Sequence, residues 1–472
     1  MPKFAIISGG TATNELVPLF TNLSQDHKTT YILPISDNGG STSEIIRVIG
    51  GPAIGDIRSR LTRLIPPHQR DLRDLLSFRL SLDPVVAKSQ WNSIVEGTHE
   101  LWTPLNSSTK EVFRSFFVHL HVELLKRSRI TQSNKRQFRY ELANVGNLFL
   151  TGVRLFIGSL DSSIELFCKL TDVDAGVVVL PCINTNFTYH ISAILENGLI
   201  ITGQSQISHP SQNGEYPPPI DKTRPPTPTD DLSRTFYFND QEDVPINEVE
   251  LSKQRVKSPI SRKSSIFFTD DEEESGNVPQ YTHPELKKSQ LHFNKSDNIE
   301  PLLSPIKRIF YVSPYGEEIC PTANARAVSA ISGCDTLIYS IGSLMTSIIP
   351  ILVLKGVGKA IVGSNACEKI LLLNGCLDRE TFGMTAADFV RCIVEAVEYS
   401  LKSSTGDAAT VEWNSVVSRV VYMSGSRIAI DEQIFTGKGI KCTEVKRIEG
   451  TDYYDLDDLE SVLSRVIHDD KS

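Results

Sequence analysis

The chain has 472 residues, of which 40% are hydrophobic and 22% are charged, and its formal net charge is −9. That length is enough to bury a large core and could hold about two or three domains. The acidic balance argues against a general nucleic-acid binder, which would present a basic surface. No apolar run reaches the roughly 18–20 residues that span a bilayer, so we expect no membrane segment.

The eight cysteines are scattered, without a CxxC pair or a His/Cys cluster at zinc spacing. We interpret them as reduced thiols of an intracellular protein. The first apolar strand begins almost at the N-terminus, which leaves no room for a secretory or transit peptide. These features predict a soluble protein of the cytoplasm or nucleus, and of the two we expect the cytoplasm.

Three Gly-rich polar turns follow apolar segments within the first sixty residues. They are Gly9-Gly10-Thr11, Asp37-Asn38-Gly39-Gly40-Ser41 and Gly55-Asp56-Ile57-Arg58. A strand that ends in a glycine pair and opens a helix brings free backbone N–H groups to one edge of a sheet, an arrangement that favours phosphate binding. The opening therefore indicates a nucleotide or another phosphorylated ligand. Because no GxGxxG follows the first strand, a dehydrogenase is disfavoured.

Apolar runs bounded by turn residues predict further strands along the chain. Together with 3–8, these are 31–35, 177–181, 190–195 and 199–202 as a hairpin, 308–312, 336–340, 360–362 and 369–373. Helices are predicted at 322–331 and at 385–401, the second with Thr385 as N-cap and Asp388 three residues later. Helical spacing of apolar residues over about 69–140 indicates a helical segment inserted after the second strand. The alternation predicts an α/β fold with a Rossmann-like, mostly parallel sheet.

The composition changes sharply at 204–305, which is rich in Ser, Pro and acidic residues. Such a segment buries too little apolar area to offset chain entropy, so we expect a long disordered insertion. It divides one domain into 1–203 and 306–445, with 446–472 as a C-terminal tail. Ser/Thr-Pro pairs such as Thr227-Pro228 and Ser258-Pro259 could be phosphorylated by kinases, or they could be chance dipeptides.

Several motifs, read in order, resemble those of the CofD/YvcK family. Besides the three opening turns, these are Gly146-Asn147-Leu-Phe-Leu150, Ile341-Gly-Ser-Leu-Met-Thr-Ser-Ile-Ile-Pro350, and Leu373-Asn374 with Glu380-Thr381-Phe-Gly-Met-Thr385-Ala-Ala-Asp388. The resemblance runs from residue 4 to about 395 and skips the helical segment and the insertion. Each motif is weak alone, whereas their common order is specific.

The resemblance implies a Rossmann-like fold and, as ligand, a nucleoside diphosphate conjugate in which the nucleoside diphosphate is GDP or UDP. CofD is a magnesium-dependent 2-phospho-L-lactate transferase, which moves a phospholactyl-type group from a guanosine diphosphate-linked donor. YvcK is a bacterial factor for growth on gluconeogenic carbon, and it binds UDP-sugars. Family relatives also imply a homodimer. Two hypotheses follow: a CofD-like transferase with an unknown acceptor, and a non-catalytic nucleotide-sugar sensor. A third is a scaffold that kept the fold and lost the ligand, against which the two Gly-rich turns and two acidic residues argue.

Acidic and basic side chains in the second and third turns are the catalytic candidates. The Asp37 carboxylate could hold Mg²⁺ or orient an acceptor hydroxyl, or it could only cap its own turn. Asp56 and Arg58 could form a structural ion pair, or Arg58 could clamp a phosphate with its planar fork.

Two later segments add binding candidates. Asn147 could contact a ribose or base edge, whereas Asn144 could simply cap the following helix. Gly and hydroxyl residues after the 336–340 strand mirror the first turn, so a ligand could lie between the two. The predicted binding residues are Gly9, Gly10, Thr11, Asn38, Gly39, Gly40, Ser41, Asn147, Gly342, Ser343, Thr346 and Ser347. Chemistry at a diphosphate needs charge neutralisation and an aligned acceptor more than a strong nucleophile.

Overall fold

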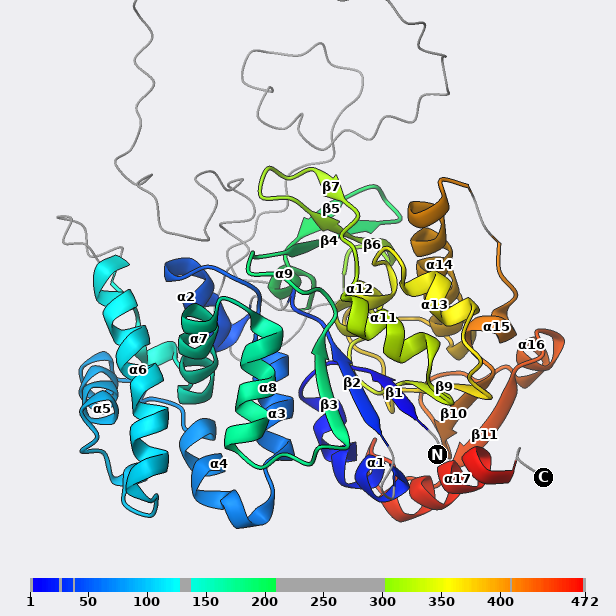
Figure 1. Ribbon diagram of the computed structural model, residues 1–472. Coiled ribbons are helices and arrows are strands. Elements are labelled where there is room, and N and C mark those ends of the chain that lie inside the picture. Colours follow the sequence, from blue (N-terminus) through cyan, green and yellow to red (C-terminus); the bar gives the residue numbers. More distant parts are fainter. Residues whose placement is uncertain are drawn as a thin grey trace, which may run out of the picture.

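The computed structural model describes residues 3–24, 28–36, 39–127, 137–208, 302–407 and 410–469. Seven strands form one all-parallel sheet at the centre of the molecule, in the order β11-β10-β9-β8-β1-β2-β3 (Figure 1). The strands are β1 (Phe4–Ile7), β2 (Thr29–Leu33), β3 (Val177–Pro181), β8 (Thr336–Tyr339), β9 (Glu368–Leu372), β10 (Arg419–Met423) and β11 (Lys441–Val445). The predicted α/β fold with a mostly parallel sheet is confirmed.

The direction in which strands are added reverses at β1. The chain adds β2 and β3 on one side of β1 and then β8, β9, β10 and β11 on the other. Right-handed crossovers place the connecting helices on opposite faces on the two sides. The boundary between β1 and β8 is therefore the topological switch point, and open α/β sheets bind ligands there, outside the carboxyl ends of the strands.

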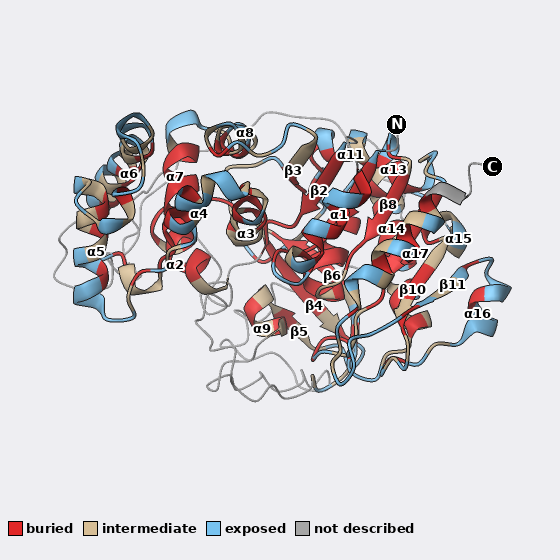
Figure 2. Ribbon diagram, turned by 90° about the horizontal axis from the view of Figure 1, so that it is seen from below, coloured by how far each residue is buried: buried red, intermediate tan, exposed pale blue. Residues whose placement is uncertain are grey.

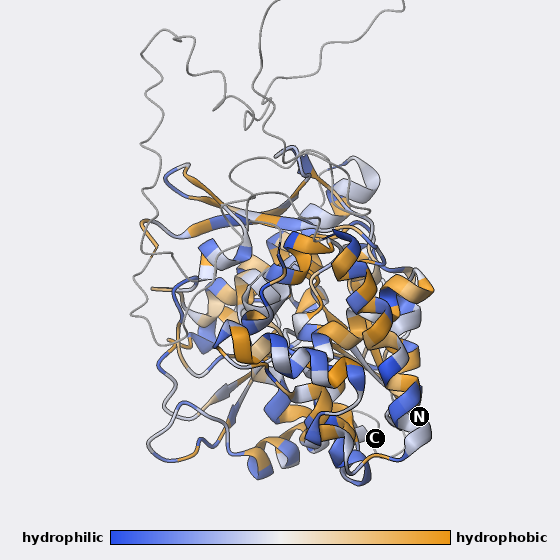
Figure 3. Ribbon diagram, turned by 90° about the vertical axis from the view of Figure 1, so that its left-hand side faces the viewer, coloured by the Kyte–Doolittle hydropathy of each residue, from blue (hydrophilic) through white to orange (hydrophobic). Residues whose placement is uncertain are grey.

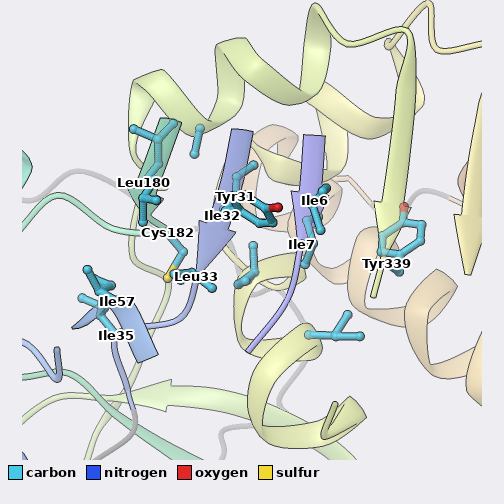
Figure 4. Close-up of a cluster of buried hydrophobic side chains, with 14 of the residues drawn as sticks. Ile6, Ile7, Tyr31, Ile32, Leu33, Ile35, Ile57, Leu180, Cys182 and Tyr339 are labelled. Atoms are coloured by element: carbon cyan, nitrogen blue, oxygen red, sulfur yellow. The ribbon is translucent and has the colours of Figure 1, made fainter. Parts of the chain in front are cut away.

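The central strands are apolar along their whole length because both faces of a parallel sheet are covered. All four residues of β1 and all five of β2 are buried. Ile6 pairs in register with Tyr31 of β2 and with Ile338 of β8. Figure 4 shows Ile6, Ile7 and Tyr31 within the cluster of buried side chains between neighbouring strands.

A second, antiparallel sheet has the order β5-β4-β6-β7, with β4 (His190–Leu195), β5 (Ile200–Thr202), β6 (Ile306–Val312) and β7 (Glu318–Ile319). The predicted hairpin at 190–202 is present, and its turn residue Gly198 has φ +84°. Pairing of β4 with β6 joins the two halves of the chain. Residues 204–208, which we assigned to the insertion, form the helix α9 (Gln204–Ser208), and 209–301 lie outside the described residues.

Helices fill the connection between β2 and β3. They are α2 (Gly40–Val48), α3 (Gly55–Leu64), α4 (Arg70–Ser77), α5 (Pro84–Glu96), α6 (Ser107–Arg127), α7 (Val145–Ile157) and α8 (Leu160–Leu170). In the predicted helical segment, Phe113 is buried and stacks on Phe149 of α7 with ring centroids 4.6 Å apart. Phe113 and Phe117 therefore belong to the core. Figure 2 shows α7 as mostly buried, whereas α5 and α6 also carry exposed residues. Figure 3 shows the molecule from the side on which α5 and α6 lie in Figure 1, and the helices on this side carry both apolar and hydrophilic residues.

The remaining helices are α1 (Val17–Ser24), α11 (Ala325–Ser332), α12 (Ile349–Leu352), α13 (Val357–Val362), α14 (Ala386–Thr405), α15 (Trp413–Val416), α16 (Glu432–Gly437) and α17 (Leu456–Asp469). The strand predicted at 360–362 is wrong, because these residues end α13. That helix packs tightly on α14: a Cβ added at Gly358 would lie 2.6 Å from the Val397 carbonyl oxygen. The expected C-terminal tail contains α17, whose Glu460 accepts a hydrogen bond from Asn22 of α1 at 3.1 Å. Among the described helices, none combines the length and apolar character needed to cross a membrane.

Candidate functional site

The first Gly-rich turn follows β1 directly, on the β1 side of the switch point. Ser8 makes the last sheet bond of this strand, from its amide to the Ile32 oxygen at 3.2 Å. Gly9 and Gly10 are buried, and Thr11 is exposed at the start of the short 3-10 helix η1 (Ala12–Leu16). The amides of Gly9, Gly10 and Thr11 donate no hydrogen bond to any described residue. Since buried amides are almost always paired, the Gly9 and Gly10 amides are available to bind an acceptor at this turn.

Both glycines of the first turn are required by close approach of other elements. A Cβ added at Gly10 would lie 2.7 Å from the Asp56 Cα atom at the start of α3. One added at Gly9 would lie 2.5 Å from Ser347 Oγ. The glycine pair thus brings the Asp56 carboxylate and the Ser347 hydroxyl beside the turn. Side-chain packing, and not only a ligand, accounts for glycine at both positions.

A buried guanidinium lies beneath the first turn. Arg60 of α3 donates to Gly9 O at 3.2 Å, to Thr13 O at 3.3 Å and to Ser8 Oγ at 3.4 Å. Its Cζ atom lies 4.5 Å from the centroid of the Tyr31 ring, and its Nε has no acceptor among the described residues. Burial lowers the pKa of Arg60 to about 10, an effect that Tyr31 and Asp56 partly oppose, so the group stays charged at neutral pH. The turn therefore sits on a positive charge whose described acceptors are neutral oxygens.

Another Gly-rich turn, Gly342-Ser343, follows β8 and faces the first turn across the switch point. From here on it is called the second turn. Gly342 has φ +141°, and the Asn374 side chain after β9 bonds both its amide (3.1 Å) and its carbonyl oxygen (2.7 Å). Ser343 caps the π-helical turn η8 (Leu344–Ile348) by accepting from the Thr346 amide at 3.0 Å. Thr13 ties the two turns together with a hydrogen bond of 2.8 Å to the Ile341 oxygen. A Cβ at Gly342 would meet open space.

A buried carboxyl group lies behind the second turn. Glu380 accepts hydrogen bonds from the hydroxyls of Ser208, Ser343 and Thr346, the last at 3.1 Å. Burial, and to a lesser extent the charge of Asp378, raises the pKa of Glu380 to about 7, although the three hydroxyls oppose the shift.

Ser41, Arg58 and Asn147 form one hydrogen-bonded chain. Arg58 Nε donates to Asn147 Oδ1 at 3.1 Å, and Asn147 Nδ2 donates to Ser41 Oγ at 2.6 Å. The terminal amino groups of Arg58 donate to no described residue. Burial and neighbouring Arg79 lower its pKa to about 10, so it remains a cation. Asn144 caps α7 by accepting from the Gly146 and Asn147 amides, as the capping alternative predicted.

The Gly-rich turn at residues 37–41 is described only in part. Asp37 and Asn38 lie outside the described residues, whereas Gly39 is the N-cap of α2 and Gly40 (φ +56°) begins it. Among the described residues there is no group of three or more His, Cys, Asp or Glu side chains that could hold a metal. Mg²⁺, however, is often held by one or two carboxylates together with substrate phosphates and water. Asp56, beside an amide-lined turn, fits that mode of binding.

Four further residues complete the arrangement and were not among the predicted site residues: Thr13, Arg60, Asn374 and Glu380. Asn374 and Glu380 lie in motifs that carry the family resemblance, so the signal was present. Arg60 and Thr13 are distinguished by no local pattern. Their roles depend on burial and on contacts between distant segments, which only the folded chain supplies.

Comparison with known proteins gives the family. The family model described as "2-phospho-L-lactate transferase CofD" matches residues 4–448. A Saccharomyces cerevisiae protein described as "Uncharacterized protein YNL011C" is 43% identical over 473 residues, covering 98% of each chain. A "Putative gluconeogenesis factor" of Clostridium acetobutylicum is 27% identical over 35% of this chain and 39% of its own length.

A solved structure gives the same fold. Protein BH3568 of Bacillus halodurans, described as a member of the UPF0052 family, superposes with a TM-score of 0.54 at 16% identity and covers 99% of both chains. At that identity the likeness concerns the fold alone. The family model, in contrast, spans nearly the whole chain, including both Gly-rich turns and every strand of the parallel sheet. The chain belongs to the CofD family.

Proposed function

We propose that this protein binds a nucleoside diphosphate conjugate between the first and second turns and acts as a transferase of the 2-phospho-L-lactate transferase type. The observation that carries the proposal is the buried Arg60 guanidinium beneath a turn whose amides have no acceptor among the described residues. A diphosphate placed there would accept from these amides and balance the buried charge. The family model supports the reaction class.

Each remaining group has a role that its position supports. The terminal amino groups of Arg58, which donate to no described residue, can clamp a phosphate, while Asn147 accepts from the Arg58 Nε. Asp56, and Asp37 outside the described residues, are the proposed Mg²⁺ ligands. The ion would neutralise charge on the diphosphate oxygens. Gly342 and Ser343 would approach the other end of the ligand.

The proposed reaction is group transfer at phosphorus. A hydroxyl of the acceptor attacks the distal phosphorus of the donor, and the bridging P–O bond breaks. The nucleoside monophosphate leaves with the electron pair of that bond, and the acceptor proton passes to a carboxylate, Asp37 or Asp56. Arg58 and the turn amides stabilise the charge that develops on the phosphoryl oxygens.

A nucleotide-sugar sensor is the second candidate. It is favoured by the match to a gluconeogenesis factor. On either reading we propose that the ligand is GDP- or UDP-linked, that the location is cytoplasmic, and that kinases act on 204–305. All eight cysteines are free thiols, in keeping with that location. A homodimer remains a proposal.

Ligand binding tests the proposal directly. Calorimetric titration of the full chain with GDP, GDP-mannose and UDP-N-acetylglucosamine, with and without Mg²⁺, should show binding of at least one of them. We expect Arg58→Gln to raise the Kd about 10- to 100-fold, because a charge-assisted bond is worth about 1.5–3 kcal/mol. Asp56→Asn should abolish any Mg²⁺ dependence of the Kd. Turnover of a GDP-linked donor would favour the transferase over the sensor.

Arg70→Gln is the matched control, since Arg70 is an arginine with a largely exposed side chain at the start of α4, a helix that contributes no residue to either turn. Its Kd should equal that of the wild type. Equal loss of affinity in both arginine variants would contradict a specific phosphate contact at Arg58. Absence of binding by every nucleotide, with or without Mg²⁺, would overturn the proposed function.

A further inference from the structure

The Glu380 carboxyl group shares its hydrogen bonds with the hydroxyls of the second turn. Its Oε2 accepts from Ser343, and its Oε1 accepts from Ser208 of α9 and from Thr346. Thr346 Oγ1 also lies 2.7 Å from Ser343 Oγ and 3.2 Å from Ser208 Oγ. The side chains therefore form a closed cluster of one carboxyl group and three hydroxyls.

The loop that carries Glu380 makes hydrogen bonds within itself and to α9. Asp378 Oδ1 accepts from the Glu380 amide at 3.0 Å, the Thr381 amide at 2.9 Å and the Thr381 hydroxyl at 2.7 Å. Arg379 donates to the Gln206 and Ile207 oxygens of α9 at 3.0 and 3.2 Å. The charged groups of this loop near Glu380 are thus Asp378 and Arg379. The elements packed against Glu380, α9 and η8, face it with hydroxyls.

The number of protons decides what the cluster can offer a ligand. Each hydroxyl has one proton to donate. When Glu380 is ionised, the protons of Ser208, Ser343 and Thr346 are directed to it, and a carboxylate stands next to the second turn. A phosphate in that position would find acceptors and a like charge. When Glu380 is protonated, its own O–H donates into the cluster, and a hydroxyl proton of the second turn becomes available.

We propose that Glu380 is a positioning residue of the second turn, and that binding of the diphosphate ligand takes up a proton on it, freeing the Ser343 or Thr346 hydroxyl to donate to a phosphate oxygen. This inference rests on the proposed function and specifies how the same site is regulated by pH. The free protein loses affinity as pH rises, because the protonated form that binds becomes scarce. Above about pH 8 the loss approaches tenfold per pH unit.

The test measures proton uptake on binding. GDP-mannose and UDP-N-acetylglucosamine are suitable probes, since a diphosphate diester lacks the ionisation near pH 6 that phosphate monoesters show. Titration at pH 8 in two buffers of different ionisation heat gives the number of protons taken up. We expect close to one for the wild type and none for Glu380→Gln, which is uncharged at every pH. Its affinity should be flat from pH 6 to 9.

Two further variants locate the effect. Glu317→Gln removes an exposed carboxylate in the β6–β7 turn and should behave as the wild type. Thr346→Val removes a hydroxyl that lowers the pKa of Glu380, so its affinity should begin to fall at a higher pH than that of the wild type. Thr346→Val keeps the test decisive if Glu380→Gln does not fold.

Inorganic pyrophosphate separates this inference from the proposed function. If nucleotides bind without proton uptake, or if Glu380→Gln keeps the wild-type pH dependence, the inference is overturned and the function stands. If pyrophosphate binds with proton uptake that Glu380→Gln abolishes while no nucleotide binds, the function falls and the inference stands. If none of these anions binds between pH 5.5 and 9, both are overturned.

Discussion

Arg60 and Glu380 are buried ionisable side chains on opposite sides of the switch point, and burial disfavours the charged form of each. For Arg60 the pKa falls to about 10, so the group stays charged at neutral pH. For Glu380 the pKa rises to about 7, so near neutral pH the group is partly protonated. Near neutral pH, Arg60 is therefore charged beside the first turn, and part of the Glu380 population beside the second turn is neutral. This balance of charge suits an anionic ligand.

The raised pKa of Glu380 makes the stability of the free protein depend on pH. Between its unfolded value of 4.5 and about 7 the folded state binds the proton more tightly, so stability falls as pH rises through this window. The full loss is about 3 kcal/mol at 1.36 kcal/mol per unit. We expect Glu380→Gln to lack this loss. Urea unfolding at pH 4.5, 6 and 8 measures the difference.

The same series with Glu317→Gln provides the control, because that carboxylate is exposed and should give the wild-type pH profile. Parallel profiles for wild type and Glu380→Gln would mean that Glu380 titrates normally in the folded protein. This readout needs no ligand, so it tests the burial of the carboxyl group separately from binding.

The structure shows which neighbours surround the predicted site residues. Gly9 and Gly10 were identified from the turn that follows β1, and the structure adds that Asp56 and Ser347 pack against them. Asn144 caps α7, whereas Asn147 reaches Arg58 and Ser41 from distant parts of the chain. Helix caps can be predicted from local sequence because both partners lie within three residues. The Asn147 contacts cannot, because their partners lie 89 and 106 residues away.

At the scale of the elements, short apolar runs correctly predicted the strands in the middle of the parallel sheet, such as β1, β2, β8 and β9. The run at 360–362 is equally apolar yet ends a helix, because Gly358 allows α13 to pack closely on α14. β10 and β11 were not predicted, and β11 is largely exposed or half-buried at the edge of the sheet. An edge strand lacks the continuous apolar pattern of a central strand, so its sequence carries a weaker signal.

The start of α14 is fixed by a complete capping box. The Thr385 hydroxyl accepts from the Asp388 amide at 3.3 Å, and Asp388 Oδ2 accepts from the Thr385 amide at 2.8 Å. We expect Thr385→Ala to lower the free energy of unfolding by about 1 kcal/mol, since a helix N–H loses its acceptor. The urea midpoint measures this loss. Thr405→Ala, at the exposed end of the same helix, should change it far less.

At the scale of the whole molecule, the two halves of the chain join without residues 209–301. β4 and β6 pair from His190–Val312 to Leu195–Ile306, and the Glu196 amide donates to the Pro305 oxygen at 2.9 Å. The β1–β8 pairing at the switch point also spans both halves. Pairing between described residues of the two halves therefore brings the first and second turns to the same edge of the sheet.

Deleting residues 210–300 and joining the ends with a short Gly/Ser linker should leave the fold intact. Shortening the connection reduces its closure entropy by about 2–3 kcal/mol, so we expect an unchanged or slightly raised Tm. Circular dichroism and thermal melting check the fold, and nucleotide titration checks the site. Recovery of only aggregated protein would contradict the prediction and would assign these residues a structural role.

The sequence by itself determined the α/β class, the central strands, the Gly-rich turns and the family resemblance. These depend on residues close together in the chain: apolar runs, glycine pairs and caps. Only the tertiary structure decided that the reversal of strand order lies between β1 and β8, that Arg60 is buried beneath the first turn, and that Glu380 is buried behind the second. The Arg60 hydrogen bonds join residues 47 to 52 positions apart, the Ser208–Glu380 contact spans 172 positions and the Thr13–Ile341 contact spans 328, and no local pattern encodes such contacts.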